Sequence, residues 1–166
     1  MTGDGGPLNA ITGEIVDAAY KLHCALGPGL LESVYEQVLM RDLERRGLRA
    51  ARQIPVSFEY DGLNFEEVCR VDILVENRIV VEIKSLERLA PVHPKQLLTY
   101  LRLLQLPLGL LINFGAPTLK EGIHRVANTV PSSASLRLRV NQLPSKGSTP
   151  ADARRPSPTG TSSPNT

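Results

Sequence analysis

Residues 68–84 constrain the fold of this chain more than any other stretch, because they predict a β-hairpin with two chemically different faces. Side chains along a strand point alternately to opposite sides of a sheet. One predicted face is wholly apolar and comprises Val71, Ile73, Val75, Ile79, Val81 and Ile83. The other carries Arg70, Asp72, Leu74, Val80, Glu82 and Lys84. The hairpin therefore has one face suited to a core and one that holds charge.

The connection between the two strands sets which residues face each other. Residues 76–78 are expected to form a three-residue connection, since Asn77 readily adopts a left-handed backbone conformation. Pairing is then symmetric about residue 77, so that Val75 faces Ile79 and Leu74 faces Val80.

The same symmetry places Asp72 opposite Glu82. Two carboxylates that face each other destabilise a sheet unless something compensates their repulsion. A divalent cation would do so, and Lys84 on the same face could reach a nearby anion, as a metal-dependent phosphodiesterase requires. An amphipathic hairpin with a solvated charged face explains these residues equally well, because their spacing is a loose pattern.

Apolar periodicity along the rest of the chain predicts a mixed α/β fold, with a mixed central sheet flanked by helices. Helices are expected at residues 11–26, 30–46 and 94–104, and strands at 53–60, 63–75, 79–84 and 108–114. The Asp61–Gly62 pair marks a tight hairpin turn. Residues 118–128 fit a strand or a helix, and the pattern does not choose between them.

Composition divides the chain into a disordered N-terminus (residues 1–7), one domain (8–130) and a disordered tail (131–166). Twenty of the 36 tail residues are Pro, Ser, Thr or Gly, which bury too little apolar surface to fold. Only the alternating patch at 136–140 resembles a strand able to dock.

The tail has a net charge of +4 and residues 1–130 a net charge of −2, so the basic character of the chain belongs to the tail. The domain therefore lacks the cationic surplus of a dedicated nucleic-acid-binding surface.

Two cysteines, Cys24 and Cys69, form neither a disulfide framework nor a metal-ligand spacing, and are expected to be free thiols. The N-terminus has no signal-peptide pattern, and no apolar run is long enough to span a membrane. We therefore expect a cytoplasmic protein that does not enter membranes.

Two further motifs flank the hairpin. A GxxExxY motif runs from Gly29 through Glu32 to Tyr35, and a QxxxY motif joins Gln96 to Tyr100. With these motifs the chain resembles, over residues 8–128, the bacterial GxxExxY proteins, a branch of the PD-(D/E)XK nuclease superfamily. The resemblance implies a restriction-endonuclease-like core that carries a metal-dependent active site.

The resemblance also implies roles for individual acidic residues. Asp72 corresponds to the metal-binding aspartate, although Val71 replaces the proline of the superfamily's name. Glu82 corresponds to the second acidic metal ligand, and the Ile83 carbonyl to a third oxygen. Glu32 corresponds to an acidic residue of the first core helix that holds the metal or a water, although the helix dipole alone also favours a carboxylate there.

Lys84 corresponds to the catalytic lysine of the superfamily, which acts on the attacking water and on the charge of the phosphoryl group. Gln96 and Tyr100 share one helix face and correspond to a pair that lines the site, although an ordinary amphipathic helix explains them too. Arg70 could bind a substrate phosphate or pair with a carboxylate. Tyr35 is expected to be structural.

The leading functional prediction is a Mg²⁺-dependent nuclease, with Mn²⁺ as a possible substitute, acting on DNA or RNA. A catalytically silent nuclease-fold binding module is the first alternative, favoured by the negative domain and by only seven aromatic residues, four Tyr and three Phe. The intact set of Asp72, Glu82 and Lys84 opposes it, because a retired site would be free to lose the like-charge pair. A small-molecule hydrolase using the same site remains a third possibility.

Overall fold

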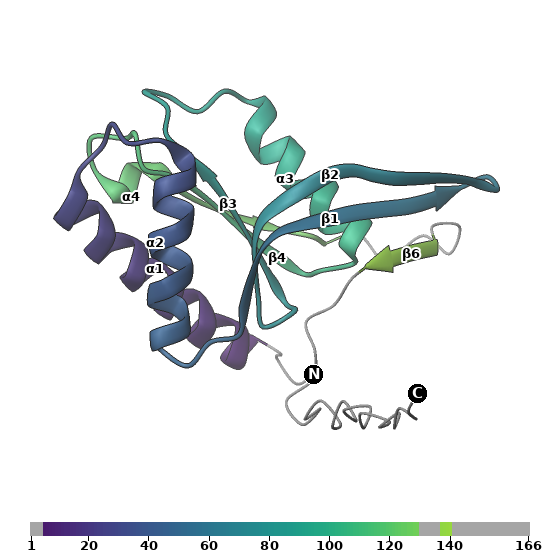
Figure 1. Ribbon diagram of the computed structural model, residues 1–166, viewed down its shortest axis with the longest axis horizontal. Helices are drawn as coiled ribbons and strands as arrows, with labels where there is room; N and C mark the ends of the chain where they lie inside the picture. Colours follow the sequence, from purple (N-terminus) through teal and green to yellow (C-terminus); the bar gives the residue numbers. More distant parts are fainter. Residues whose placement is uncertain (1–4, 130–136, 141–166) are drawn as a thin grey trace, which may run out of the picture.

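A central sheet with helices on both faces forms the body of the protein, and one hairpin extends away from it (Figure 1). The computed structural model describes residues 5–129 and 137–140. The helices are α1 (Gly5–Leu26), α2 (Glu32–Arg45), α3 (Val92–Leu104) and α4 (Leu119–Gly122). The strands are β1 (Ala50–Tyr60), β2 (Leu63–Val75), β3 (Ile79–Lys84), β4 (Leu108–Asn113), β5 (Ile123–Ala127) and β6 (Arg137–Val140). The expected mixed α/β fold is confirmed.

Among the residues that the structure describes, the sheet has six strands in the order β5-β4-β3-β2-β1-β6. Only β3 and β4 pair in parallel, and the other neighbours are antiparallel. A parallel pair needs a long crossover connection, which here contains α3. The apolar run at 108–114 accordingly forms β4, a strand whose residues are all buried.

The two faces of the sheet are covered by different helices. Ile73, Val75, Ile79, Val81 and Ile83 pack with residues of α1 and α2 in one core cluster. Leu74 and Val80 pack with residues of α3 in a second cluster. This division follows the alternation predicted for the hairpin.

Val71 departs from that prediction, because it packs in the α3-side cluster rather than with Ile73. The observed β2–β3 pairs run from Val75–Ile79 to Ile73–Val81. At Val71 the strand pairs only with β1, opposite Ile54, which packs on the same side. The faces of β2 therefore stop following those of β3 once the two strands separate.

Both predicted hairpin connections are confirmed. Tyr60 pairs with Leu63 across a two-residue turn whose Asp61 (φ 49°) and Gly62 (φ 77°) are both left-handed, as a tight turn between twisted strands requires. In the second connection Asn77 is left-handed (φ 53°), and so is Glu76 (φ 52°).

Several boundaries differ from those expected. The first helix begins at Gly5, so residues 5–7 belong to a helix rather than to an N-terminal extension. The ambiguous segment 118–128 contains both a short helix, α4, and a strand, β5. Part of the apolar patch at 136–140 forms β6, which adds to the outer edge of β1. The rest of the expected tail, residues 131–136 and 141–166, lies outside the described residues.

Within residues 5–129 and 137–140, no helix has both the length and the apolar character of a membrane span.

Tyr35 ties the start of α2 to the turn that precedes it. Its hydroxyl donates a hydrogen bond to the Gly27 carbonyl at 2.6 Å and accepts one from the Leu30 N–H at 3.1 Å. The ring is fully buried and stacks on Phe114 at a centroid distance of 4.4 Å. Gly29 in this turn has φ 110°, a conformation that favours glycine. The aromatic residue of the GxxExxY motif thus holds the α1–α2 turn in place.

We predict that Tyr35→Phe lowers the free energy of unfolding by about 1–2 kcal/mol, because one hydrogen bond is lost and a backbone N–H loses its acceptor. Urea denaturation followed by circular dichroism measures the change. Tyr20→Phe is the matched control, since Tyr20 is exposed on α1. Equal midpoints for the two variants would contradict the structural role of the Tyr35 hydroxyl.

Candidate active site

Two carboxylates lie where β2 and β3 separate. Asp72 and Glu82 directly follow the Ile73–Val81 pair, and the Asp72 carboxylate accepts a hydrogen bond from the Ile83 N–H at 2.7 Å. Glu82 is only 4% exposed, and within the described residues its Oε2 atom has no hydrogen-bond partner. A buried polar atom without a partner is uncommon and calls for an explanation.

Burial and the charges of neighbouring carboxylates raise the pKa of both Asp72 and Glu82. Burial, followed by the charge of Asp72, raises the pKa of Glu82 to about 7. Burial is also the main cause of the raised pKa of Asp72, and the Ile83 N–H and Lys84 only partly oppose it. The positive charge near the two carboxylates is therefore not enough to stabilise both of them in the ionised form.

Lys84 supplies part of that charge. Its ammonium group donates to Glu82 Oε1 at 2.9 Å, and most of the side chain is buried. Burial alone would lower the pKa of Lys84, but the hydrogen bond to Glu82 and the nearby carboxylates outweigh it, so its pKa is raised. Lys84 is consequently cationic at neutral pH.

Glu32 lies at the rim of this cluster, in the first turn of α2. Its Oε1 atom accepts a hydrogen bond from the Ser85 N–H at 3.2 Å, and the Ser85 hydroxyl donates to the Leu30 carbonyl at 2.7 Å. These contacts join the start of α2 to the end of β3. An open pocket of about 460 Å³, lined by Leu30, Leu31, Glu32, Ser33 and Ser85, adjoins them.

Helix α3 places Gln96 and Tyr100 beside the carboxylates. The Gln96 amide donates to the Tyr100 hydroxyl at 2.7 Å. Burial, followed by the charge of Glu82, raises the pKa of Tyr100 to about 12, so its hydroxyl stays protonated. The structure thus gathers Asp72, Glu82 and Lys84, with Glu32 at one border and the Gln96–Tyr100 pair at another.

A comparison with protein families gives this cluster its context. Residues 9–126, well over half of the chain, match the family model described as PD-(D/E)XK nuclease superfamily. The chain belongs to the PD-(D/E)XK nuclease superfamily. Neither the curated proteins nor the solved structures contain a significant match. The superfamily is described as a nuclease superfamily, so the match supports nuclease activity for this chain.

Arg70 is the predicted site residue that the structure does not bring into the cluster of this nuclease fold. It forms an ion pair with Glu67 at 2.8 Å on the exposed part of β2. No described contact joins it to Asp72. The alternative already visible in the sequence, pairing with a carboxylate, is the observed arrangement.

Glu36 is a neighbour of the cluster that sequence reasoning missed. It is buried one helical turn after Glu32, and its charge contributes to the raised pKa of Asp72. The carboxylate accepts hydrogen bonds from Arg52 at 2.6 Å and from Gln53 at 3.0 Å. Gln53 is left-handed (φ 53°) although it lies within β1. The sequence did contain a signal that could have identified Glu36, because it is a second acidic residue one turn from Glu32 on the sheet-facing side of the helix.

Cys69 is a free thiol, as predicted, but its place near the cluster was not predicted from the sequence. Burial, followed by the charge of Glu82, raises the pKa of this thiol to about 11. Cys69 therefore lies within the electrostatic reach of the cluster as a neutral group.

The donor set suits a hard cation that keeps much of its hydration shell. Among residues 5–129 and 137–140, no three His, Cys, Asp or Glu side chains converge into a closed metal cage. Mg²⁺ commonly binds through one or two carboxylates and retains several waters. The unsatisfied Glu82 oxygen beside Asp72 fits such an ion and does not fit a cation that requires a full protein cage.

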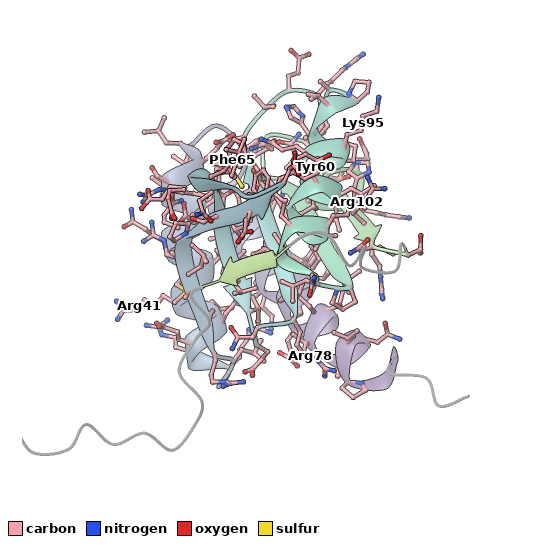
Figure 2. All side chains as sticks on the ribbon, turned by 90° about the vertical axis from the view of Figure 1, so that its right-hand side faces the viewer. Arg41, Tyr60, Phe65, Arg78, Lys95 and Arg102 are labelled. Atoms are coloured by element: carbon pink, nitrogen blue, oxygen red, sulfur yellow. The ribbon has the colours of Figure 1, made fainter. Side chains whose placement is uncertain are left out.

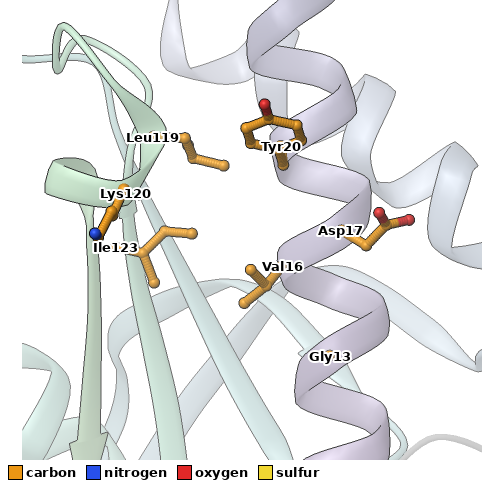
Figure 3. A pocket seen from close by; sticks show the side chains of 7 residues that line it. All are labelled: Gly13, Val16, Asp17, Tyr20, Leu119, Lys120 and Ile123. Carbon is orange, nitrogen blue, oxygen red and sulfur yellow. The ribbon is translucent and has the colours of Figure 1, made fainter.

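A second hollow lies elsewhere on the molecule, between α1 and the α4–β5 segment (Figure 3). It has a volume of about 500 Å³, and its lining is mainly apolar, with Val16, Leu119 and Ile123 among the contributors. None of the acidic or basic residues of the candidate active site lines it. This hollow is therefore separate from the carboxylate cluster.

The raised pKa of Glu82 predicts a stability change in Glu82→Gln. In the metal-free wild type, this group binds its proton more tightly when folded than at its ordinary pKa of 4.5, so its contribution to stability is lost as pH rises from about 4.5 through 7. Glu82→Gln should remove this loss and be more stable than wild type at pH 8 by about 2–3 kcal/mol. Asp72 remains to compensate Lys84.

Thermal melting in EDTA at pH 5 and pH 8 checks this prediction. The advantage of Glu82→Gln should be small at pH 5 and should widen at pH 8. A variant less stable than wild type at pH 8 would show that the Glu82–Lys84 ion pair outweighs the desolvation of the carboxylate.

Proposed function

We propose that this protein is a Mg²⁺-dependent nuclease of the GxxExxY branch, which hydrolyses phosphodiester bonds of DNA or RNA. The observation that carries the proposal is the buried Glu82 oxygen without a partner among the described residues, held beside Asp72 and Lys84. Maintaining two repelling, desolvated carboxylates costs stability, which is reasonable where a cation binds. Membership of the nuclease superfamily supports the same conclusion.

Asp72 and Glu82 are the residues that would hold the ion, with the Ile83 carbonyl as a further oxygen. When bound there, Mg²⁺ would supply Lewis-acid stabilisation of the phosphoryl charge and a more acidic water as nucleophile near neutral pH. The hydrogen bond from the Ile83 N–H fixes one Asp72 oxygen in place. The second ligand is anchored through Glu82 Oε1 by Lys84.

Lys84 is proposed to act on the reacting groups rather than as a ligand. Its ammonium group has three donors, of which Glu82 occupies one, so the others can orient the attacking water and the phosphoryl group. A fixed positive charge in a partly buried site stabilises the negative charge that develops on phosphate.

Glu32 and the Gln96–Tyr100 pair are proposed to border the substrate. Glu32 faces the open pocket beside Ser85 and would hold a water on the outer side of the ion. The protonated Tyr100 hydroxyl and the Gln96 amide offer hydrogen bonds at the opposite border. Arg70 is proposed to contact a more distant phosphate of the substrate when it is released from Glu67.

A catalytically silent binding module is the main competing function. The net charge of −2 on residues 1–130 favours it, since nucleic-acid surfaces are usually cationic. It predicts no cleavage by the wild-type protein with any metal. A small-molecule hydrolase would instead cleave a simple phosphodiester while leaving polynucleotides intact.

We predict that Lys84→Ala reduces cleavage at least about 100-fold, because a positioned charge in the transition state is lost. Metal binding should persist, since lysine is not a ligand. Cleavage of single- and double-stranded DNA and RNA with Mg²⁺ or Mn²⁺ measures the effect, and Lys120→Ala on α4 is the matched control. Metal-dependent cleavage that survives Lys84→Ala unchanged would eliminate this mechanism.

We predict that Asp72→Asn abolishes measurable Mn²⁺ binding, whereas Glu32→Gln weakens it only modestly. Binding by the wild type should strengthen from pH 6 to pH 8, because Glu82, with a pKa of about 7, must release its proton to become a ligand. Isothermal titration calorimetry at both pH values tests this. Unchanged affinity in Asp72→Asn would rule out the proposed metal site.

A further inference from the structure

The outer part of the β1–β2 hairpin, residues 57–68, projects away from the sheet and is called the arm below (Figure 1). The side chains of Phe58, Tyr60, Leu63 and Phe65 occupy one face of it, because Phe58 pairs with Phe65 and Tyr60 with Leu63 across the strands. The two Phe rings stack at a centroid distance of 5.0 Å. Tyr60 is 58% exposed and Leu63 is 62% exposed.

The arm carries an irregularity in β2 that leaves this face intact. Two extra residues of β2 fall between the Phe58–Phe65 pair and the Val56–Cys69 pair, where Glu67 is left-handed (φ 45°). The Glu67 N–H donates to the Ser57 hydroxyl at 2.9 Å, which holds the bulge. Residues on β1 keep their alternation, so Val56, Phe58 and Tyr60 share one side.

That side of the arm leads into the candidate active site. Val56 is fully buried in the α3-side cluster, and Cys69, its partner on β2, packs against the same cluster. Tyr100 belongs to that cluster, and the charge of Glu82 reaches both Cys69 and Tyr100. The exposed aromatic face therefore continues, without a change of side, to the carboxylates.

Charge is distributed unevenly around this surface. Glu59 alternates with Phe58 and Tyr60 and so lies on the opposite face of the arm. In the view toward the end of the arm, Lys95 and Arg102 of α3 are exposed (Figure 2), and Figure 1 shows that α3 lies beside the base of the arm, whereas Tyr60 lies near its projecting end. The cations of α3 therefore lie toward the base of the arm, whereas the arm itself carries Glu59, Asp61, Glu66 and Glu67 and no Lys or Arg.

We propose that the apolar face of the arm is a stacking platform for unpaired nucleobases, and that the substrate is a single-stranded nucleic acid. As a statement about substrate, this inference rests on the proposed nuclease function. Every base has a π-face, so stacking on aromatic side chains binds single strands without sequence preference. Bases inside a duplex are already stacked and cannot use such a platform. Lys95 and Arg102 supply contacts to the phosphates.

A second copy of the chain would also bury an apolar surface. The platform leads toward Glu82 and Tyr100, however, as a bound strand that reaches the carboxylates requires. This continuity with the candidate active site favours a polynucleotide as the occupant.

Fluorescence anisotropy with labelled oligo-dT and oligo-U, in Ca²⁺ instead of Mg²⁺, tests the inference. Tyr60→Leu and Phe65→Leu retain apolar bulk but lack the ring, and each should weaken single-strand binding about tenfold. Tyr20→Leu is the matched control, since Tyr20 on α1 is also 58% exposed. The corresponding duplexes should bind more weakly than the single strands, and the melting temperatures of all three variants should stay near that of wild type.

Several results would overturn the stacking platform. It would be overturned if the wild-type protein bound no single strands, if the arm variants bound them as tightly as wild type, or if duplexes bound as tightly as single strands. A dimer in size-exclusion chromatography that Tyr60→Leu dissociates would identify a second copy as the occupant.

The outcomes also separate this inference from the proposed function. Lys84→Ala should bind single strands like wild type but not cleave them. Arm-dependent binding by a wild type that cleaves nothing would retain the platform and end the nuclease proposal. If the wild type cleaves nucleic acid and the arm variants bind it as tightly as wild type, the nuclease proposal is retained and the stacking platform is ruled out.

Discussion

The electrostatic conflict between Asp72 and Glu82 is the constraint on which the rest of the site depends. Glu82 is buried and Asp72 is partly buried, and the sheet itself offers them one backbone donor, the Ile83 N–H. They can occupy this position because β2 and β3 separate there, so the Asp72 side chain takes a hydrogen bond that a backbone carbonyl would otherwise accept. Lys84 compensates one charge only. The fold therefore contains an unfavourable interaction that a bound cation would relieve, and the apolar clusters on both faces of the sheet stabilise the fold against it.

Strand β2 has an exposed first part and a buried last part. From Ile73 to Val75 it lies between β1 and β3 with its residues buried, so Asp72 directly adjoins the buried centre of the sheet. From Leu63 to Val68 it belongs to the exposed arm, where it pairs with β1. Because both parts belong to one continuous strand, the position of any ligand on the arm is coupled to the position of Asp72 through backbone hydrogen bonds rather than through a flexible loop.

Short-range patterns made the hairpin, its register and the grouping of Asp72, Glu82 and Lys84 predictable from the sequence, because strand alternation and turn length decide them locally. The switch of Val71 to the α3 side was not predictable, since it depends on where β2 leaves β3. Glu36 was missed for a similar reason: its partners Arg52 and Gln53 come from β1, and only the folded chain brings them to α2. The addition of β6 to β1 likewise required tertiary structure. The alternating pattern at 136–140 predicted a strand, but not its partner.

The negative charge of the domain favours a silent binding module over a nuclease, but it is compatible with binding by stacking on the arm. A protein that binds mainly by neutralising phosphates needs a cationic surplus, and residues 1–130 have none. Stacking does not need it, because the attraction is between rings rather than between charges. Of the three Phe residues in the chain, two lie on the apolar face of the arm, and one of the four Tyr residues lies beside them. Three of the seven aromatic residues thus lie where an unpaired base could use them, and the acidic residues of the candidate active site would be available to bind a metal.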